Sequence, residues 1–164
     1  MRFILRQKFL SFGDDFVIRN EHGHDCFIVD GRAFSIGDKL AIRNMEGKEV
    51  AFIAQKLLSW GPSYRIHRPG LPVTEVHKKH FTIFHCQYEV DGPGDEDYEA
   101  SGDFLEHEYH FKRHGHLVAE VSKHWFAFTD TYGIDIAEGE DPVLLLATAV
   151  VIDLVCHADK DQKH

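Results

Sequence analysis

The run Val143-Leu144-Leu145-Leu146-Ala147-Thr148-Ala149-Val150-Val151-Ile152 contains no charged residue, and Thr148 is its one polar member. Asp141 and Pro142 precede it. This pair is typical of a helix start, because Asp accepts the free N–H groups of the first turn and Pro needs no donor there. A helix that is apolar on every side has to be buried all round. The run therefore predicts a helix in the centre of the molecule.

This helix is too short to be a membrane anchor. A transmembrane helix needs about 20 predominantly apolar residues, whereas Asp153, His157 and Asp159 follow the apolar run closely. We expect a core helix over about residues 141–157 and a disordered tail after about residue 159. A buried Asp153 needs a partner, and His157, one turn further on, is a candidate. The core of the helix is expected to comprise Val143, Leu144, Leu145, Leu146, Val150 and Ile152.

A hairpin pattern recurs along the rest of the chain. Residues 18–23 (IRNEHG) are followed by residues 42–47 (IRNMEG), with four identical positions, and weaker echoes end at Gly70 and Gly115. Alternation on both sides of a Gly predicts two antiparallel strands joined by a tight turn, because Gly takes a positive φ at little cost. Chance similarity between alternating strands is the alternative to a true repeat.

These hairpins predict a closed sheet. With the flanking alternating runs, about a dozen short strands fit the chain, which is enough for a barrel without exposed edges. A barrel of that size is too wide for its own side chains to fill, and the apolar helix would fill it. The expected fold class is therefore mainly β, a single domain over residues 1–164 in which a closed antiparallel barrel of about twelve strands surrounds a buried C-terminal α-helix.

One interval departs from the regular spacing. The distance from Gly70 to Gly115 is nearly twice that from Gly47 to Gly70, which we interpret as an insertion. It contains the acidic stretch 91–97 (DGPGDED). Carboxylates could bind calcium, but the stretch lacks the spacing and the distal Glu of an EF-hand. Its composition favours a solvated, flexible loop.

Composition limits the class of partner and the compartment. Hydrophobic residues make up 43% of the 164 residues, as in a globular domain. The net charge of −9 disfavours nucleic acid as a partner. The odd number of cysteines, three, without a C-x-x-C pair indicates reduced thiols. Because Arg6 and Lys8 interrupt the apolar N-terminus, no signal peptide is predicted, and we expect a cytoplasmic protein that is not transmembrane.

Several motifs, in order along the chain, resemble those of the LURP-one-related family. They are residues 34–40 (FSIGDKL), 55–59 (QKLLS), 125–126 (WF) and 130–137 (DTYGIDIA), and the resemblance extends from Gln7 to His157. That family is similar in fold to tubby C-terminal domains and phospholipid scramblases. The resemblance therefore implies a tubby-like, twelve-stranded barrel threaded by its C-terminal helix. It implies no catalytic activity, and the basic positions through which tubby domains bind phosphoinositides do not map onto this sequence.

Two turns carry the same histidine pair. The tripeptide His-Gly-His occupies residues 22–24 and residues 114–116, at equivalent tips of two repeat units. Equivalent tips should lie at the same end of the barrel, where four imidazoles could converge on a metal such as zinc. The alternative is that they are solvated turn residues. The predicted metal ligands are His22, His24, His114 and His116.

The clearest charge asymmetry lies between residues 65 and 80. This stretch has four Lys or Arg residues and three histidines against one acid, Glu75. Two paired strands could present it to phosphate groups as a basic face. The alternative is a solvated face that is balanced by acids from neighbouring strands. The predicted anion-binding residues are Arg65, Arg68, Lys78 and Lys79.

The sequence has no nucleophile motif of the G-x-S-x-G type and no Gly-rich phosphate loop, and no cysteine has a readable base partner. We therefore predict no enzyme, no catalytic residue and no cofactor. The expected function is a noncatalytic binding or scaffold module for an anionic, phosphoinositide-like lipid headgroup or a protein partner. The alternative is a metal-dependent enzyme that uses the turn histidines, which a bound ion with an open coordination position would favour.

Overall fold

The computed structural model describes residues 1–6, 15–30, 39–56, 63–82, 85–92, 94, 97–126 and 131–161, and for residues 80–82, 85, 86 and 157–161 it describes the backbone alone. These residues form twelve strands and one helix. The elements are β1 (Arg2–Arg6), β2 (Phe16–Asn20), β3 (Asp25–Asp30), β4 (Lys39–Asn44), β5 (Glu49–Gln55), β6 (Ser63–His67), β7 (Thr74–Thr82), β8 (His85–Asp91), β9 (Tyr98–Asp103), β10 (Glu108–Arg113), β11 (His116–Ser122), β12 (Thr131–Ile136) and α1 (Pro142–Asp161).

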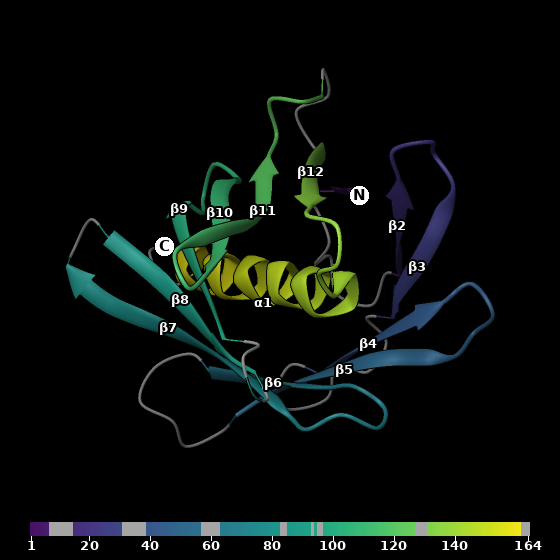
Figure 1. Ribbon diagram of the computed structural model, residues 1–164, viewed down its shortest axis with the longest axis horizontal. Helices are drawn as coiled ribbons and strands as arrows, with labels where there is room; N and C mark the ends of the chain where they lie inside the picture. Colours follow the sequence, from purple (N-terminus) through teal and green to yellow (C-terminus); the bar gives the residue numbers. More distant parts are fainter. Residues whose placement is uncertain are drawn as a thin grey trace.

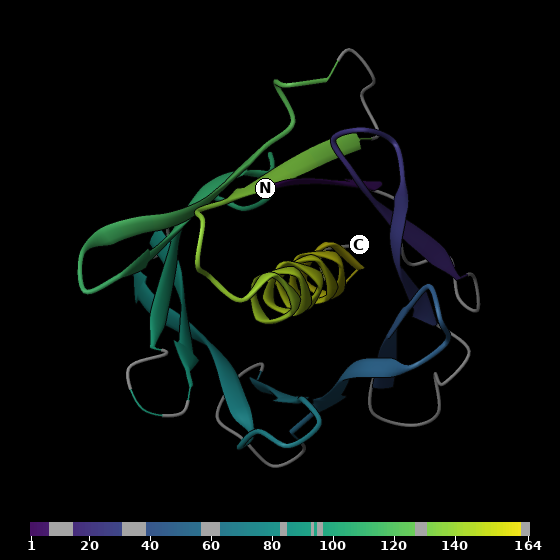
Figure 2. The same ribbon diagram turned by 45° about the vertical axis from the view of Figure 1, so that its right-hand side comes forward.

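The strands form one closed barrel. Each is antiparallel to its neighbours, and the order around the barrel follows the sequence. β1 closes the circle by pairing with β12, with Phe3 opposite Ile134 and Leu5 opposite Tyr132. Figure 2 shows the strands surrounding the helix on all sides. The predicted fold class, a closed antiparallel barrel around a C-terminal helix, is confirmed.

The two copies of the repeated hexapeptide form the same turn. Asn20 and Asn44 each accept, through Oδ1, two backbone N–H groups of the turn that follows, at 2.9–3.1 Å. Gly23 and Gly47 have φ angles of 81° and 82°, a region in which Gly meets no steric penalty. The strand pairing shifts register just before each turn. The repeat in the sequence is therefore a repeat of turn geometry.

The long interval between Gly70 and Gly115 is not an insertion, and this part of the sequence interpretation is wrong. It holds four strands, β7 to β10, whereas the interval from Gly47 to Gly70 holds two, β5 and β6. The doubled spacing is one further unit of the same architecture. The acidic stretch 91–97 begins at the end of β8 and leads to β9; its residues 93, 95 and 96 lie outside the described residues.

The helix α1 lies inside the barrel (Figure 1). Asp141 caps it, because its Oδ1 accepts the N–H groups of Val143 at 2.9 Å and Leu144 at 3.4 Å. Val143 is half-buried, and the side chains that follow are buried. Exposed fractions of 1% or less are found for Leu144, Leu145, Leu146, Val150 and Ile152.

The helix begins where the sequence predicts and extends to Asp161, beyond the expected end near residue 157. Residues 160 and 161, which we expected in a disordered tail, are helical, and residues 162–164 lie outside the described residues. Nowhere in the described chain is a helix both long enough and apolar enough to cross a membrane.

Trp125, Phe126 and Gly133, which belong to two of the family-like motifs, have a packing role. A Cβ at Gly133 of β12 would lie 2.8 Å from Phe126 and 3.0 Å from Trp125, so only Gly fits beneath these two rings. The guanidinium of Arg2, on the neighbouring strand β1, lies 4.2 Å from the centroid of Trp125. The aromatic pair therefore covers the seam at which the barrel closes.

Leu145→Asp should lower the free energy of unfolding by roughly 4 kcal/mol or more, because it places an unpaired charge among apolar groups. Leu117→Asp is the matched control. It changes a side chain that is 56% exposed and should alter stability by less than about 0.5 kcal/mol. Urea unfolding followed by tryptophan fluorescence compares the two. Equal midpoints, or a native-like cooperative transition after deletion of residues 141–164, would contradict a central structural role for the helix.

Candidate functional site

The antiparallel order places alternate connections at opposite ends of the barrel. We call the end at which α1 begins the mouth. It carries the β2–β3, β4–β5, β6–β7, β8–β9 and β10–β11 connections, together with the segment from β12 to α1. The other end, the far end, carries the remaining connections.

An ion pair at the mouth ties the barrel wall to the helix start. Arg68, directly after β6, donates from Nη1 to Asp141 Oδ2 and from Nη2 to Thr74 Oγ1 at 3.3 Å. The Arg68 side chain is only 3% exposed. The other carboxylate oxygen of Asp141 caps α1. Arg68, which we predicted as an anion-binding residue, therefore binds a carboxylate of its own chain.

A second arginine fixes the residue before Asp141. Arg113 of β10 donates from Nη2 to Glu140 Oε1 at 2.6 Å, and the hydroxyl of Tyr98 donates to Glu140 Oε2 at 2.9 Å. The Glu140 side chain is 8% exposed. Charge-assisted bonds of this kind are about twice as strong as neutral ones. The entrance of the helix into the barrel is thus held from two sides of the wall.

A small concavity, which we call the notch, lies beside the helix start. It is formed by the β4–β5 hairpin, the β6–β7 turn and the first turn of α1, and its volume is about 240 Å³. Small-molecule sites usually have volumes of about 300–1,000 Å³. The notch is lined by Lys48, Glu49, Val50, Arg68, Pro69, Leu71, Asp141 and Val143.

Large apolar side chains are exposed around the notch. Met45, at the tip of the β4–β5 hairpin, and Leu71, in the β6–β7 connection, are each 49% exposed, and Val73 is 44% exposed. With the apolar residues of the notch they lie on two neighbouring hairpins and the helix start. We call this set the mouth patch; it comprises Met45, Val50, Pro69, Leu71, Val73 and Val143.

Exposed acidic side chains lie on one hairpin of the mouth patch and in the segment before the helix. Glu46 and Glu49 lie on the same hairpin as Met45, and Glu138 lies in the segment that leads to α1; all three are exposed. Within the described part of the chain none of them has an ion-pair partner. One base, Lys48, lies among them. The surroundings of the mouth patch therefore carry net negative charge, as does the whole chain.

The predicted basic face is divided by the structure. Arg65 and Lys79 lie on the outer wall, where Arg65 Nε is 3.3 Å from Glu75 Oε1 and Lys79 is paired with Glu89. Lys78 is half-buried and lies on the opposite side of β7 from Lys79, because successive side chains alternate along a strand. Arg68 is buried at the mouth. The four residues do not form one cluster, although anion binding by them stays a prediction.

Glu75 neutralises much of the basic stretch. Partial burial acts to raise the pKa of Glu75, but the charge of Lys56 and the hydrogen bond from Arg65, with His77, hold that pKa below its usual value. His77 Nε2 also lies 3.2 Å from Asp91 Oδ2. Cations on this wall therefore alternate with carboxylates. This agrees with the alternative interpretation of the stretch as a solvated face whose charge is balanced by neighbouring acids.

The turn histidines lie at the mouth, on the β2–β3 and β10–β11 tips, and all four are exposed. The rings of His22 and His24 are 6.3 Å apart. β1 and β12 separate these two hairpins in the barrel order. Among the residues that the structure describes, no three His, Cys, Asp or Glu side chains are placed to hold a metal ion. A metal site at His22, His24, His114 and His116 stays a prediction.

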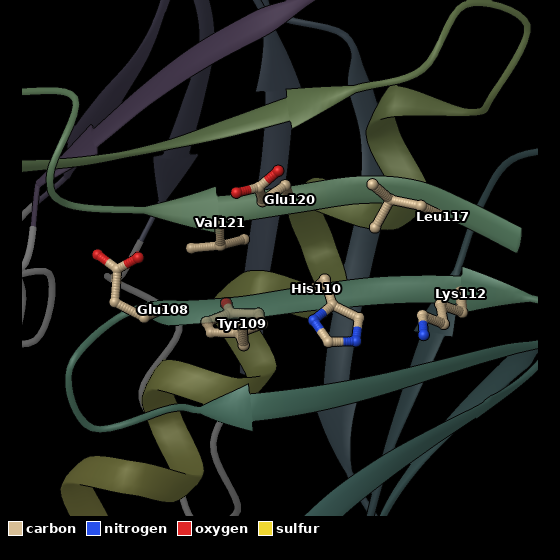
Figure 3. Close-up of a pocket in the computed structure, with 7 residues that line it drawn as sticks. All are labelled: Glu108, Tyr109, His110, Lys112, Leu117, Glu120 and Val121. Atoms are coloured by element: carbon tan, nitrogen blue, oxygen red, sulfur yellow. The ribbon is translucent and has the colours of Figure 1, made fainter. Parts of the chain in front are cut away.

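A shallow groove crosses β10 and β11 on the outer wall (Figure 3). It is lined by Glu108, Tyr109, His110, Lys112, Leu117, Glu120 and Val121. His110 lies opposite Glu120 in the strand pairing, and its Nε2 is 3.1 Å from Ser101 Oγ. A serine–histidine contact alone does not make an active site, which also needs a group that orients the histidine and donors aimed at an oxyanion. We assign no reaction to this groove.

Sequence reasoning missed a polar cluster inside the barrel. Asp153 of α1 is 3% exposed. Its Oδ1 lies 2.9 Å from His107 Nε2, and its Oδ2 accepts from the Tyr132 hydroxyl at 2.5 Å. We expected Asp153 to be paired, and it is. The expected partner was His157, whose side chain is not among those described; the partners found lie in the β9–β10 turn and on β12.

The cluster keeps its tyrosines protonated. Burial raises the pKa of Tyr109 and of Tyr132 well above the ordinary value, and the negative charge of Asp153 raises both further. Tyr132 therefore acts as a hydroxyl donor over the whole physiological range. His107 has a φ of 53°, a left-handed backbone that His tolerates better than most residues. The burial of Asp153 could be inferred from the sequence, but its partners depend on how the barrel closes.

These features define the class of protein: a closed antiparallel barrel that encloses its own C-terminal helix and exposes an apolar patch at its mouth. The chain belongs to the LURP-one-related family, which it matches over residues 1–153. The family resemblance seen in the sequence is thus confirmed.

Two relatives show how far the likeness extends. The chain is 34% identical over 158 residues to the uncharacterized protein YxjI of Bacillus subtilis (strain 168). The matched region covers 96% of this chain and 95% of that protein. An X-ray structure of a protein from Arabidopsis thaliana has a similar fold, with a TM-score of 0.62 and 16% identity over 92% of this chain and 88% of that one. At that identity the second likeness concerns the fold alone.

Asp153→Ala should lower the free energy of unfolding by about 3 kcal/mol, because it leaves two buried donors without an acceptor. Asp153→Asn keeps an acceptor oxygen and should cost less. In a Tyr132→Phe background the cost of Asp153→Ala should shrink, since one of the donors is already gone. Urea denaturation of the four proteins measures the coupling. Strict additivity of the two substitutions would show that Asp153 and Tyr132 do not interact.

Proposed function

We propose that this chain is a noncatalytic binding module that docks a protein partner at its mouth. The observation that carries the proposal is the mouth patch. Met45, Leu71 and Val73 are large apolar side chains that stay about half exposed in the two connections that form the notch, and Leu71 lines the notch itself. Single exposed apolar residues are ordinary, whereas apolar residues gathered at one place and rimmed by polar ones mark interaction sites.

The surrounding structure supports a stable platform for such docking. Arg68 and Arg113 hold the helix start through Asp141 and Glu140, so the first turn of α1 cannot shift freely at the mouth. A preformed surface loses little conformational entropy when it binds. A helix start that is fixed in this way therefore supports recognition of a partner at the mouth.

A protein partner fits the charges better than an anionic lipid headgroup does. Arg65, Lys79 and Arg68 each have a carboxylate within ion-pair distance, and acids border the mouth patch. Such a surface repels an anionic membrane unless specific contacts outweigh the repulsion. Because the family motifs imply a tubby-like fold, we also test the hypothesis that the chain binds an anionic lipid headgroup. The reduced cysteines inferred from the sequence lead us to propose a cytoplasmic location for the encounter.

Photo-crosslinking tests the docking surface. Met45, Leu71 and Leu105 are each 49% exposed, but Leu105 lies in the β9–β10 turn at the far end. With benzoylphenylalanine at each position in turn, expressed in the source cell, positions 45 and 71 should give the same adduct by mass. Position 105 should not, because it lies away from the mouth. Equal labelling at all three positions, or none at 45 and 71, would count against the proposal.

Binding of an anionic lipid headgroup can be tested separately, through the predicted anion-binding residues. We expect no pelleting of the protein with vesicles that contain multiply phosphorylated phosphoinositides, at either low or physiological salt, because carboxylates already neutralise the cations. The double variant Lys78→Glu, Lys79→Glu is the control. Salt-sensitive pelleting of the wild type that this variant loses, with an unchanged melting temperature, would establish a headgroup site and contradict our expectation.

A further inference from the structure

The chemistry of the partner follows from the size of the notch and the charges around it; this step rests on the proposed function. The notch has a volume of about 240 Å³ and apolar walls from Val50, Pro69, Leu71 and Val143. This is below the usual range for small-molecule sites. It is the scale of a single large side chain, and a buried apolar anchor is the usual centre of a protein interface.

Most polar groups at the base of the notch already have partners; among the described residues only Arg68 Nε lacks a hydrogen bond there. The guanidinium of Arg68 is bonded to Asp141 and Thr74, and the remaining oxygen of Asp141 caps the helix. A charged anchor entering the notch would lose its hydration and find these groups occupied. An aliphatic or aromatic anchor loses nothing there and buries apolar area against Leu71 and Val143.

The rim of the notch has the opposite character. Glu49 lines the notch and Glu46 lies on the same hairpin; both are exposed and have no ion-pair partner among the described residues. Of the two bases that line the notch, Arg68 is paired with Asp141 and Lys48 lies between the two glutamates in the sequence. The histidines of the other tips lie on different hairpins. Carboxylates that are exposed and unpaired keep their hydration until a cation approaches, and they accelerate the encounter with a cationic surface.

We propose that the partner docks through a cationic segment. One aliphatic or aromatic side chain of that segment fills the notch, and its neighbouring Lys or Arg residues face Glu46 and Glu49. The apolar contact supplies the anchor, and the charges supply orientation and association rate. Acidic and strongly anionic partners are excluded from the same surface by the like charge at its rim.

Selection from a random twelve-residue peptide library tests the inference with the intact protein as target. Peptides that bind wild type but not Leu71→Asp report on the notch. They should share one large apolar residue flanked by Lys or Arg. Leu71 is half exposed, so Leu71→Asp should keep the wild-type melting temperature, which differential scanning calorimetry checks before selection.

Charge reversal then tests the rim. The double variant Glu46→Lys, Glu49→Lys should bind the selected peptide at least about tenfold more weakly, chiefly through a slower association rate. The matched control Glu106→Lys, Glu120→Lys makes the same change of charge away from the mouth and should alter affinity by less than about threefold. Fluorescence anisotropy at low and physiological salt measures both, and the difference should shrink as salt rises.

The outcomes separate the two proposals. Notch-dependent peptides that are neutral or acidic, or an equal loss of affinity in both charge-reversal variants, would overturn the cationic partner and leave the docking surface standing. A library that yields no peptide distinguishing wild type from Leu71→Asp would overturn the docking surface itself, and the cationic partner with it.

Discussion

The fold depends on the mutual burial of the helix and the barrel. A closed barrel of twelve strands is too wide to be filled by its own inward side chains, and a helix that is apolar on every side cannot remain in water. Each element solves the packing problem of the other. The turns, the register and the closure between β1 and β12 all serve to wrap a continuous wall around α1.

Polar groups then decide how the helix lies inside the wall. Arg68 and Arg113 hold its beginning at the mouth, and His107 and Tyr132 hold Asp153 toward the far end. A buried carboxylate is tolerable only where donors meet it. A helix displaced along the barrel by one turn would leave both sets of donors unpaired, so these contacts select one position from many that are equally apolar.

Internal pairing also balances the charges of the outer wall at β6 and β7. The cations of β6 and β7 are opposed by carboxylates on neighbouring strands, with Glu75 between Lys56 and Arg65. At the mouth, the connections expose Met45 and Leu71, and Glu46 and Glu49 have no ion-pair partner among the described residues. This is the end of the barrel at which we propose that a partner docks.

The sequence by itself determined the elements. The uncharged run after Asp141-Pro142 indicated a buried helix, and the repeated Ile-Arg-Asn-x-x-Gly indicated hairpins, because both are local patterns of polarity and turn chemistry. It also indicated that Asp153 needs a partner. The doubled spacing before Gly115 was wrongly interpreted as an insertion. A long loop and an additional pair of strands lengthen the interval between two turn glycines by similar amounts, so the spacing alone does not distinguish them.

Only the tertiary structure decided which groups meet. His107 and Asp153 are 46 residues apart, and Arg68 and Asp141 are 73 residues apart; no local pattern connects them. Their pairing follows from the closure and register of the barrel, which place distant strands and the helix side by side. The notch arises in the same way, because Val50, Leu71 and Val143 come together only when two hairpins and the helix start converge. Long-range contacts of this kind depend on the packing of the whole chain, so no local sequence pattern predicts them.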